Sequence, residues 1–205
     1  RFGGEAMANA NLRAGFARDV ALLRLVGMKP IVVHGGGWGI DALLATMGME
    51  SKRYRGHRIT DERTLTVVEM ALSELNQELT SLLNQHGCRA VGVDGHDGAF
   101  IRARPLTLNE PDPAAPDLGF LGEVEHIDPA YIELLLSRSF IPVVMPIGVG
   151  HDGATYHINS DLLAAQLARA LAAEKLVLMT NIDGVKDREG RVVPILEASE
   201  AETVP

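Results

Sequence analysis

Two glycine-rich turns are the first part of this chain that points to chemistry. Gly3-Gly4 follows what would be the end of a first strand, and Gly35-Gly36-Gly37 follows the apolar run 31–34. Backbone N–H groups in such turns, with a helix beginning behind them, can surround phosphate or carboxylate oxygens. Each turn is a weak signal by itself, because tight strand-to-helix turns also use glycine for steric reasons. Neither turn fits the Walker pattern or the dinucleotide fingerprint.

An arginine and a polar cluster add further candidate ligands. Arg58 lies in the stretch 56–61, just before an expected helix, where its planar guanidinium suits a bidentate carboxylate. A salt bridge to a nearby acid such as Asp61 is the simpler alternative. The stretch 156–161 gathers Asn, Ser and Asp at a strand-to-helix junction, the usual ligand crevice of an open α/β sheet. The helix dipole alone would also favour Asp161 in a first helical turn.

The elements that must position these residues alternate along the chain. Apolar periodicity predicts helices over residues 9–26, 40–47, 61–86 and 161–172, and a further helix that begins at Asp128-Pro129. Strands are expected over residues 31–34, 90–93, 99–103, 122–126, 141–146, 155–158 and 175–180. We expect Thr60 to cap the longest helix and Gly87 to end it. Buried strands separated by helices predict a three-layer α/β/α sandwich with a central, mainly parallel sheet, and a small hairpin region within residues 91–125.

Composition excludes several classes of protein. The chain has 205 residues, of which 46% are hydrophobic, and this is typical of a folded domain. A net charge of −8 and an aromatic content of 4% argue against nucleic acid or an anionic membrane as a partner. The longest apolar runs are too short to span a bilayer, and no leader is visible. The single cysteine, Cys88, suits the cytoplasm, and the histidines show no metal-ligand spacing, so we expect no metal site.

Six motifs occur here in one order: Phe-Gly-Gly-Glu-Ala-Met, Val-Val-His-Gly-Gly-Gly, Gly-His-Arg-Ile-Thr-Asp, Asp-Leu-Gly-Phe-Leu-Gly-Glu-Val, Pro-Ile-Gly-Val and Tyr-His-Ile-Asn-Ser-Asp. Their order and spacing resemble the amino-acid kinase superfamily, and within it the N-acetylglutamate kinase branch of arginine biosynthesis. The resemblance extends over essentially the whole chain. It implies transfer of a phosphoryl group from MgATP to the side-chain carboxylate of N-acetyl-L-glutamate. A carboxylate is already a nucleophile, so positioning and charge neutralisation would supply the catalysis.

The resemblance also implies a role for individual residues. The expected catalytic residues are Arg1, Gly4, Gly36 and Asp161. The expected substrate-binding residues are Gly36, Gly37, Arg58, His157 and Asn159. The nucleotide would contact Gly3, Gly4, Asn181, Ile182, Asp183, Gly184, Val185 and Lys186, with Mg²⁺ bound through the nucleotide. The expected partners are the amino-acid substrate and ATP, in a homodimer or larger homo-oligomer.

Several departures from the family pattern leave an alternative open. Arg1 stands where the family has a lysine, and His157 stands where it has an asparagine. Both ends look cut, so residues 1–172 would form the amino-acid-binding lobe and residues 173–205 only the beginning of a nucleotide lobe. The alternative is a catalytically impaired binding domain, such as an arginine sensor or the regulatory half of an N-acetylglutamate synthase. From His157 we expect weaker use of N-acetylglutamate or preference for a related acidic substrate, with an imidazole of ordinary pKa and binding that strengthens as pH falls through about 6.5. The alternative is that His157 turns away and packs against Tyr156 or the turn at Trp38.

Overall fold

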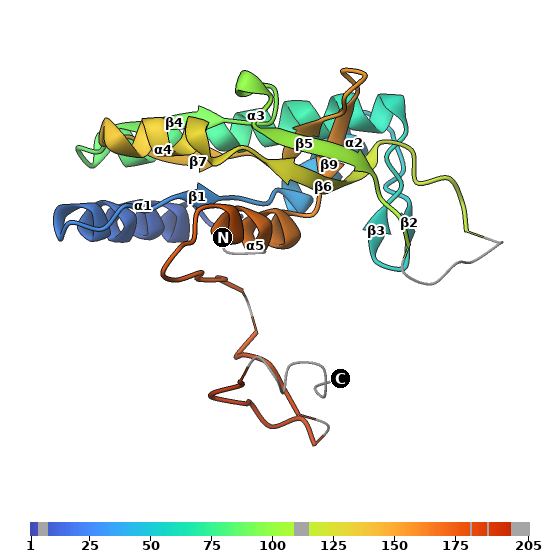
Figure 1. Cartoon of the computed structure of the whole chain (residues 1–205). Coiled ribbons are helices and arrows are strands. Elements are labelled where there is room, and N and C mark those ends of the chain that lie inside the picture. Colours follow the sequence, from blue (N-terminus) through green and yellow to red (C-terminus); the bar gives the residue numbers. More distant parts are fainter. Residues whose placement is uncertain (4–7, 109–114, 181, 188, 198–205) are drawn as a thin grey trace.

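The computed structural model describes residues 1–3, 8–108, 115–180, 182–187 and 189–197. The helices are α1 (Ala10–Leu25), α2 (Gly37–Thr46), α3 (Glu62–Gln85), α4 (Pro129–Ser137) and α5 (Ser160–Ala170), with a short 3₁₀ turn, η2 (Asp97–Ala99). The strands are β1 (Val32–Val33), β2 (Arg53–Tyr54), β3 (His57–Arg58), β4 (Ala90–Val93), β5 (Ile101–Pro105), β6 (Leu121–Ile127), β7 (Ile141–Val144), β8 (Ile147–Val149) and β9 (Thr155–Ile158). Figure 1 shows their arrangement.

A parallel sheet in the order β1-β7-β4 forms the centre of the fold. Val143 of β7 lies between Val32 of β1 and Gly92 of β4. Phe2 adds to the β1 side through a parallel bridge to His34. The carboxyl ends of these strands therefore meet at one edge, where both glycine turns begin.

Helices cover both faces of this sheet. On one face, side chains of α1 and α3 pack with Val32, Ile141 and Val143, and Phe2 stacks on Phe16 of α1 with ring centroids 4.0 Å apart. On the other face, side chains of α4 and α5 pack with Val33, Val93 and Val144 in a second cluster. Successive strand residues point to opposite faces, so each strand of the sheet contributes to both clusters. The predicted sandwich with a mainly parallel sheet is confirmed.

The predicted hairpin region is built differently from our expectation. Strand β4 belongs to the parallel sheet, whereas β5 and β6 pair antiparallel and join β8 and β9 in a closed barrel of order β5-β6-β9-β8. The sequence did not indicate closure, because the strands that complete the barrel come from beyond the hairpin region. The barrel holds β9 and the first residue of α5 beside the parallel sheet.

Side-chain caps define the helix starts. Asn9, Asp128 and Asn159 accept backbone N–H groups at the starts of α1, α4 and α5, as their residue types predict. The prediction for Thr60 is wrong: Asp61 caps α3 through a 2.8 Å hydrogen bond from the Thr64 N–H, while the Thr60 hydroxyl donates to the Arg58 carbonyl. Gly87 ends α3 with a φ of +79°, as expected.

The strand expected over residues 175–180 is absent from the structure. Residues 176–179 are exposed, and backbone hydrogen bonds join Val177 and Met179 to Arg1 alone. An apolar run such as residues 175–180 forms a strand only where several of its residues pair with a neighbouring strand. The segment that follows α5 runs away from the rest of the molecule (Figure 1). None of the helices that the structure describes is long and apolar enough to cross a membrane.

We expect Leu79→Ala to lower the free energy of unfolding by about 2–5 kcal/mol, because the side chain is fully buried between α3 and the sheet. Met70→Ala on the same helix is the matched control. Its side chain is 51% exposed, so we expect a change within about 0.5 kcal/mol. Denaturant unfolding curves measure both changes, and equal effects would contradict this placement of α3.

Candidate functional site

The two glycine turns lie side by side at the edge of the parallel sheet. The Phe2 N–H donates to the Val33 carbonyl at 2.8 Å, and the Gly35 N–H donates to the Phe2 carbonyl at 3.0 Å. Gly3 and Gly35 therefore leave neighbouring strands at the same level. Gly4, predicted to be catalytic, lies outside the described residues.

Gly36 allows α3 to approach the second turn closely. A Cβ at this position would lie 2.7 Å from Leu72 Cδ2 and 2.9 Å from Leu75 Cδ1, both in buried side chains. The backbone N–H groups of Gly36 and Gly37 donate to no described residue. Gly37 begins α2, and a Cβ there would meet nothing within 4 Å, so the turn opens outward. The arrangement is that of an anion-binding turn at a helix N-terminus.

The guanidinium of Arg1 lies across both turns. Its Nε is 3.1 Å from Asp161 Oδ1, and its Nε and one terminal nitrogen each lie 3.2 Å from Ser160 Oγ. A Cβ added to Gly3 would come 2.5 Å from the central carbon of this guanidinium, and one added to Gly35 would come 3.2 Å from a terminal nitrogen. A positive charge therefore sits where the glycine turns meet the start of α5.

Asn159 lies at the same junction, and its side-chain oxygen is already engaged. It accepts the backbone N–H groups of Asp161 at 2.8 Å and Leu162 at 3.3 Å. The side-chain NH₂ donates to no described residue. Asn159 can therefore cap α5 and still offer a donor to a ligand.

Arg58 forms a second cationic centre, and its side chain is only 4% exposed. One terminal nitrogen, NH1, donates to Asp41 Oδ1 at 2.6 Å and to Ser51 Oγ at 2.5 Å. The other, NH2, lies 3.4 Å from the Gly37 carbonyl. The simpler alternative, a salt bridge to a nearby acid, is confirmed, but the acid is Asp41 and not Asp61, whose carboxylate caps α3. The Nε edge donates to no described residue, so one edge of the fork stays available for a carboxylate.

The Asp41 carboxylate joins two arginines, since Arg53 NH2 lies 3.1 Å from its Oδ2. Partial burial by itself would raise the pKa of Asp41. Hydrogen bonds from Arg58 and Ser51, together with the charges of Arg58 and Arg53, outweigh burial and lower this pKa to about 2. Asp41 therefore stays ionised at neutral pH and compensates the buried charge of Arg58.

The stretch 117–122 holds the loop that carries Arg58. Thr60 pairs with Gly119 in a parallel bridge, and the Phe120 N–H donates to the Thr60 carbonyl at 2.7 Å. On the other side, the Phe120 carbonyl accepts the His157 N–H at 2.9 Å. This stretch thus connects Arg58 to β9.

His157 has an unsatisfied ring nitrogen. Its Nδ1 is buried and has no hydrogen-bond partner among the described residues. Burial, followed by the nearby charges of Arg58 and Arg53, lowers the pKa of His157 to about 4. The expected titration near pH 6.5 is therefore wrong for the ligand-free protein, in which the imidazole is neutral at physiological pH.

Comparison with known proteins agrees with this arrangement. A model of the amino acid kinase family matches residues 1–204. This chain belongs to the amino acid kinase family.

Individual relatives of this amino acid kinase narrow the comparison. An acetylglutamate kinase of Chromobacterium violaceum is 54% identical over 199 residues, which cover 97% of this chain and 69% of the relative. An acetylglutamate kinase of Nitrosospira multiformis is 48% identical over 204 residues, which cover 98% of this chain and 70% of the relative. Among solved structures, N-acetylglutamate synthase from Neisseria gonorrhoeae, complexed with coenzyme A and N-acetyl-glutamate, matches with a TM-score of 0.84. It is 26% identical and is matched over 99% of this chain and 46% of its own.

Of the residues predicted to contact the nucleotide, Gly3 lies in a glycine turn, whereas the C-terminal ones that the structure describes are not brought to either turn. Residues 182–186 lie in the segment after α5, where Lys186 pairs with Val192 in an isolated antiparallel bridge. Within the described part of the chain, residues 182–186 form no hydrogen bond with Gly3 or Gly35. Asn181, also predicted, lies outside the described residues.

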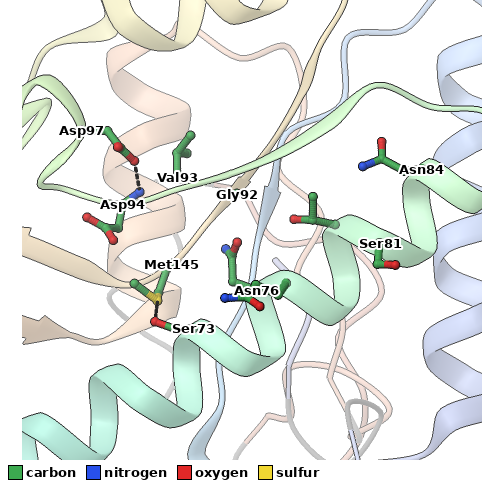
Figure 2. A pocket seen from close by; sticks show the side chains of 11 residues that line it. Ser73, Asn76, Ser81, Asn84, Gly92, Val93, Asp94, Asp97 and Met145 are labelled. Carbon is green, nitrogen blue, oxygen red and sulfur yellow. Dashed lines mark hydrogen bonds between the residues drawn. The ribbon is translucent and has the colours of Figure 1, made fainter.

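Two cavities lie beside the site. One, of about 610 Å³, runs along α3 and β4 and includes Asn76 and Gly92 (Figure 2). The other, of about 570 Å³, lies between residues 105–108 and 115–121. The described residues contain no group of three or more His, Cys, Asp or Glu side chains that could hold a metal ion.

Sequence reasoning missed Asp41 and Ser51, which hold Arg58. For Arg1 it predicted the polar cluster around Asp161 but gave no role to Ser160, which contacts the guanidinium. Asp41 gave one usable signal, because it lies one helical turn after Gly37 and so on the same side of α2. Ser51 gave none, since it lies in a loop of ordinary composition.

We expect Asp41→Asn to lower the free energy of unfolding by about 1 kcal/mol at pH 7. The lowered pKa of Asp41 by itself implies a larger loss in the free energy of unfolding. We expect the smaller loss because the side chain is 41% exposed and solvent screens its charge. A carboxyl whose pKa is lowered by folding stabilises above its unfolded pKa of about 3.9, and this stabilisation is lost as pH falls through about 2. The difference from wild type should therefore shrink below about pH 4.

Urea unfolding of both proteins between about pH 7 and pH 3 measures this effect, on either side of the unfolded pKa. Asp19→Asn is the control, because that side chain is 72% exposed on α1 and should show no comparable difference. An Asp41→Asn difference that is independent of pH would contradict the ion pair.

Proposed function

We propose that this protein transfers the terminal phosphoryl group of ATP to the side-chain carboxylate of N-acetyl-L-glutamate, forming an acyl phosphate in arginine biosynthesis. The observation that carries the proposal is the convergence of Arg1, two glycine turns and Asp161 at one sheet edge, beside the separate buried Arg58. Relatives about 50% identical that bear the name acetylglutamate kinase support this substrate. It makes the protein a transferase with a carboxyl group as acceptor.

Charge neutralisation and positioning carry this reaction. The attacking carboxylate needs no general base, so the protein must hold two anionic groups together and offset their repulsion. Gly36 offers a backbone N–H to the group in transfer, and Gly4 is assigned the same role from the resemblance. Arg1 places a guanidinium at this point, and Asp161 together with Ser160 fixes its direction. Arginine keeps the charge of the family lysine but spreads it over a planar fork.

The substrate's amino-acid end lies toward α2 and β9 in this proposal. Arg58 binds the α-carboxylate through its available Nε edge, and Asn159 donates its free NH₂. Gly36 and Gly37 hold the acyl-acceptor end, and His157 faces the substrate with its buried Nδ1. Because that ring is neutral, it offers one donor and one acceptor on opposite edges.

Membership of the amino acid kinase family and the kinase relatives support ATP as the phosphoryl donor, and Mg²⁺ bound through the nucleotide completes the proposal. Gly3 suits the phosphate groups of ATP, because no side chain lies between its backbone and the Arg1 guanidinium. We assign residues 173–205 to the beginning of a nucleotide lobe, with residues 181–186 under the nucleotide. Residues 1–172 form the amino-acid-binding lobe. A homo-oligomeric state and a cytoplasmic location stay predictions.

A catalytically impaired sensor or synthase domain is not favoured. The structure retains a cation at the position of the family lysine, and the synthase that matches in fold is 26% identical, against 54% for the kinase of Chromobacterium violaceum.

Trapping of the acyl phosphate with hydroxylamine tests the activity directly. The full-length protein, incubated with MgATP, N-acetylglutamate and hydroxylamine, should form a hydroxamate whose amount matches the ADP released. Glutamate and N-acetylaspartate serve as control acceptors. ADP release without hydroxamate would exclude a carboxyl acceptor.

We expect Arg58→Lys to raise the KM for N-acetylglutamate at least about 10-fold, since an ammonium cannot form the bidentate pair. The KM for ATP should stay within about threefold, because Arg58 lies away from the glycine turn of Gly3. Arg104→Lys is the matched control, since that arginine is 60% exposed and pairs with Glu123. An unchanged KM in a folded Arg58→Lys protein would remove Arg58 from the substrate site.

We expect His157→Asn to tighten binding of N-acetylglutamate about 3- to 10-fold, because an amide offers a donor and an acceptor in one plane. Calorimetric titration at about pH 6 and about pH 8, on either side of an ordinary histidine pKa, should give the same ratio of affinities. The imidazole is neutral at both values, since its pKa is about 4. Equal affinities of both proteins would make His157 a bystander, and a gain at lower pH seen only in wild type would place an imidazolium in the site.

A further inference from the structure

His34 is a fully buried titratable residue to which the proposed reaction assigns no role. It directly follows β1 and directly precedes the glycine turn. Burial of an imidazole is costly unless both ring nitrogens are hydrogen-bonded. In this structure both are: Nδ1 lies 2.9 Å from the Gly35 carbonyl oxygen, and Nε2 lies 3.1 Å from Nδ2 of Asn76.

The partners of Asn76 determine where the imidazole proton lies. Its Nδ2 also lies 2.8 Å from the Val143 carbonyl, which can only accept, so the amide NH₂ must face that side. The remaining N–H of the amide then points to His34, and Nε2 must accept it. The proton is therefore on Nδ1, which donates to the Gly35 carbonyl. Burial lowers the pKa of His34 to about 4, so the ring keeps this neutral form at physiological pH.

The room for Asn76 comes from Gly92 on β4. A Cβ at this position would lie 1.8 Å from Asn76 Oδ1, so any side chain would displace the amide. Figure 2 shows Asn76 rising from α3 toward the strand that carries Gly92. The pair is thus supported from α3, β4 and β7 together.

The Gly35 carbonyl and the Gly36 N–H belong to the same peptide unit. That unit is planar and trans, so its carbonyl and its N–H point in opposite directions. A peptide flanked by two glycines rotates easily, because neither residue has a Cβ to restrict it. A hydrogen bond to the Gly35 carbonyl therefore decides the direction of the Gly36 N–H.

We infer that His34, oriented by Asn76, is a positioning residue that holds the Gly35–Gly36 peptide so that the Gly36 N–H points to the phosphoryl group in transfer. The inference rests on the proposed function, because it assumes that Gly36 contacts that group. His34 touches neither substrate and acts through the backbone. Of the groups assigned to N-acetylglutamate, Arg58 and Asn159 are held by other parts of the protein. His34 should therefore affect the rate of transfer more than the binding of N-acetylglutamate.

Two near-isosteric variants separate the two ring nitrogens. In His34→Asn the side-chain NH₂ takes the place of Nδ1 and keeps a donor to the Gly35 carbonyl. In His34→Gln the side-chain oxygen reaches the place of Nε2 and keeps an acceptor for Asn76, but the donor is lost. We expect His34→Gln to lower kcat about 10- to 100-fold with the KM for N-acetylglutamate within about threefold, and His34→Asn to keep kcat within about threefold of wild type.

Thermal unfolding of both variants is measured in parallel, because a merely structural histidine would lower stability without this kcat difference. Equal kcat values for the two variants, whether high or low, would overturn the inference. If wild type forms no hydroxamate at all, the proposed function fails, and the inference about catalysis fails with it.

A second measurement does not depend on activity. Ring ¹⁵N spectra of the wild-type protein distinguish a protonated from a bare imidazole nitrogen. The His34 signals are those that are lost in His34→Asn or, if that protein is unstable, those that shift in Asn76→Asp. Protonation at Nδ1 between about pH 6 and pH 8, on either side of the ordinary histidine pKa, would support the pair. Protonation at Nε2 would overturn it.

Discussion

The close approach of α3 to the glycine turn is the constraint on which the rest of the site depends. Leu72 and Leu75 lie so near Gly36 that no side chain fits between them, and Asn76 reaches past the turn to the sheet. One helix thus packs the core and supports the backbone of the turn. Displacement of α3 would change both, so the stability of this layer and the geometry of the turn are coupled through the same side chains.

Two arginines, Arg58 and Arg1, place positive charge at two separate points of the site. Arg58 is buried and compensated by Asp41, which leaves one edge of its fork for an anion. Arg1 is more accessible and pairs with Asp161, whose side chain is 48% exposed. Each guanidinium is thus held by one partly exposed carboxylate and one serine hydroxyl, Asp41 and Ser51 for Arg58, Asp161 and Ser160 for Arg1. The arginines differ in their own burial, since 4% of the Arg58 side chain and 16% of the Arg1 side chain are exposed.

Local sequence patterns predict most of the helices and strands, but they do not predict contacts between residues that are distant in the sequence. Residues 61–86 were recognised as a helix because six leucine and valine residues form one stripe, but Thr60 and Asp61 are both capping residue types, and only geometry selects Asp61. The run 175–180 has strand composition, yet its only described partner is Arg1. The residue type of Arg58 predicts a carboxylate partner, whereas the identity of Asp41, 17 residues away, follows only from the fold. The low pKa of His157 follows from burial and charge that a sequence does not display.

Closure of the barrel has a consequence for how this family can vary in length. His157 pairs with Leu121 on one side and Ile147 on the other, so β9 cannot move along either neighbour without breaking both ladders. A single inserted residue would exchange the two faces of β9 and turn the His157 side chain to the opposite face of the strand. A one-residue insertion within residues 155–158 therefore breaks two ladders of hydrogen bonds at once, which limits the change of length that this part of the chain can accept.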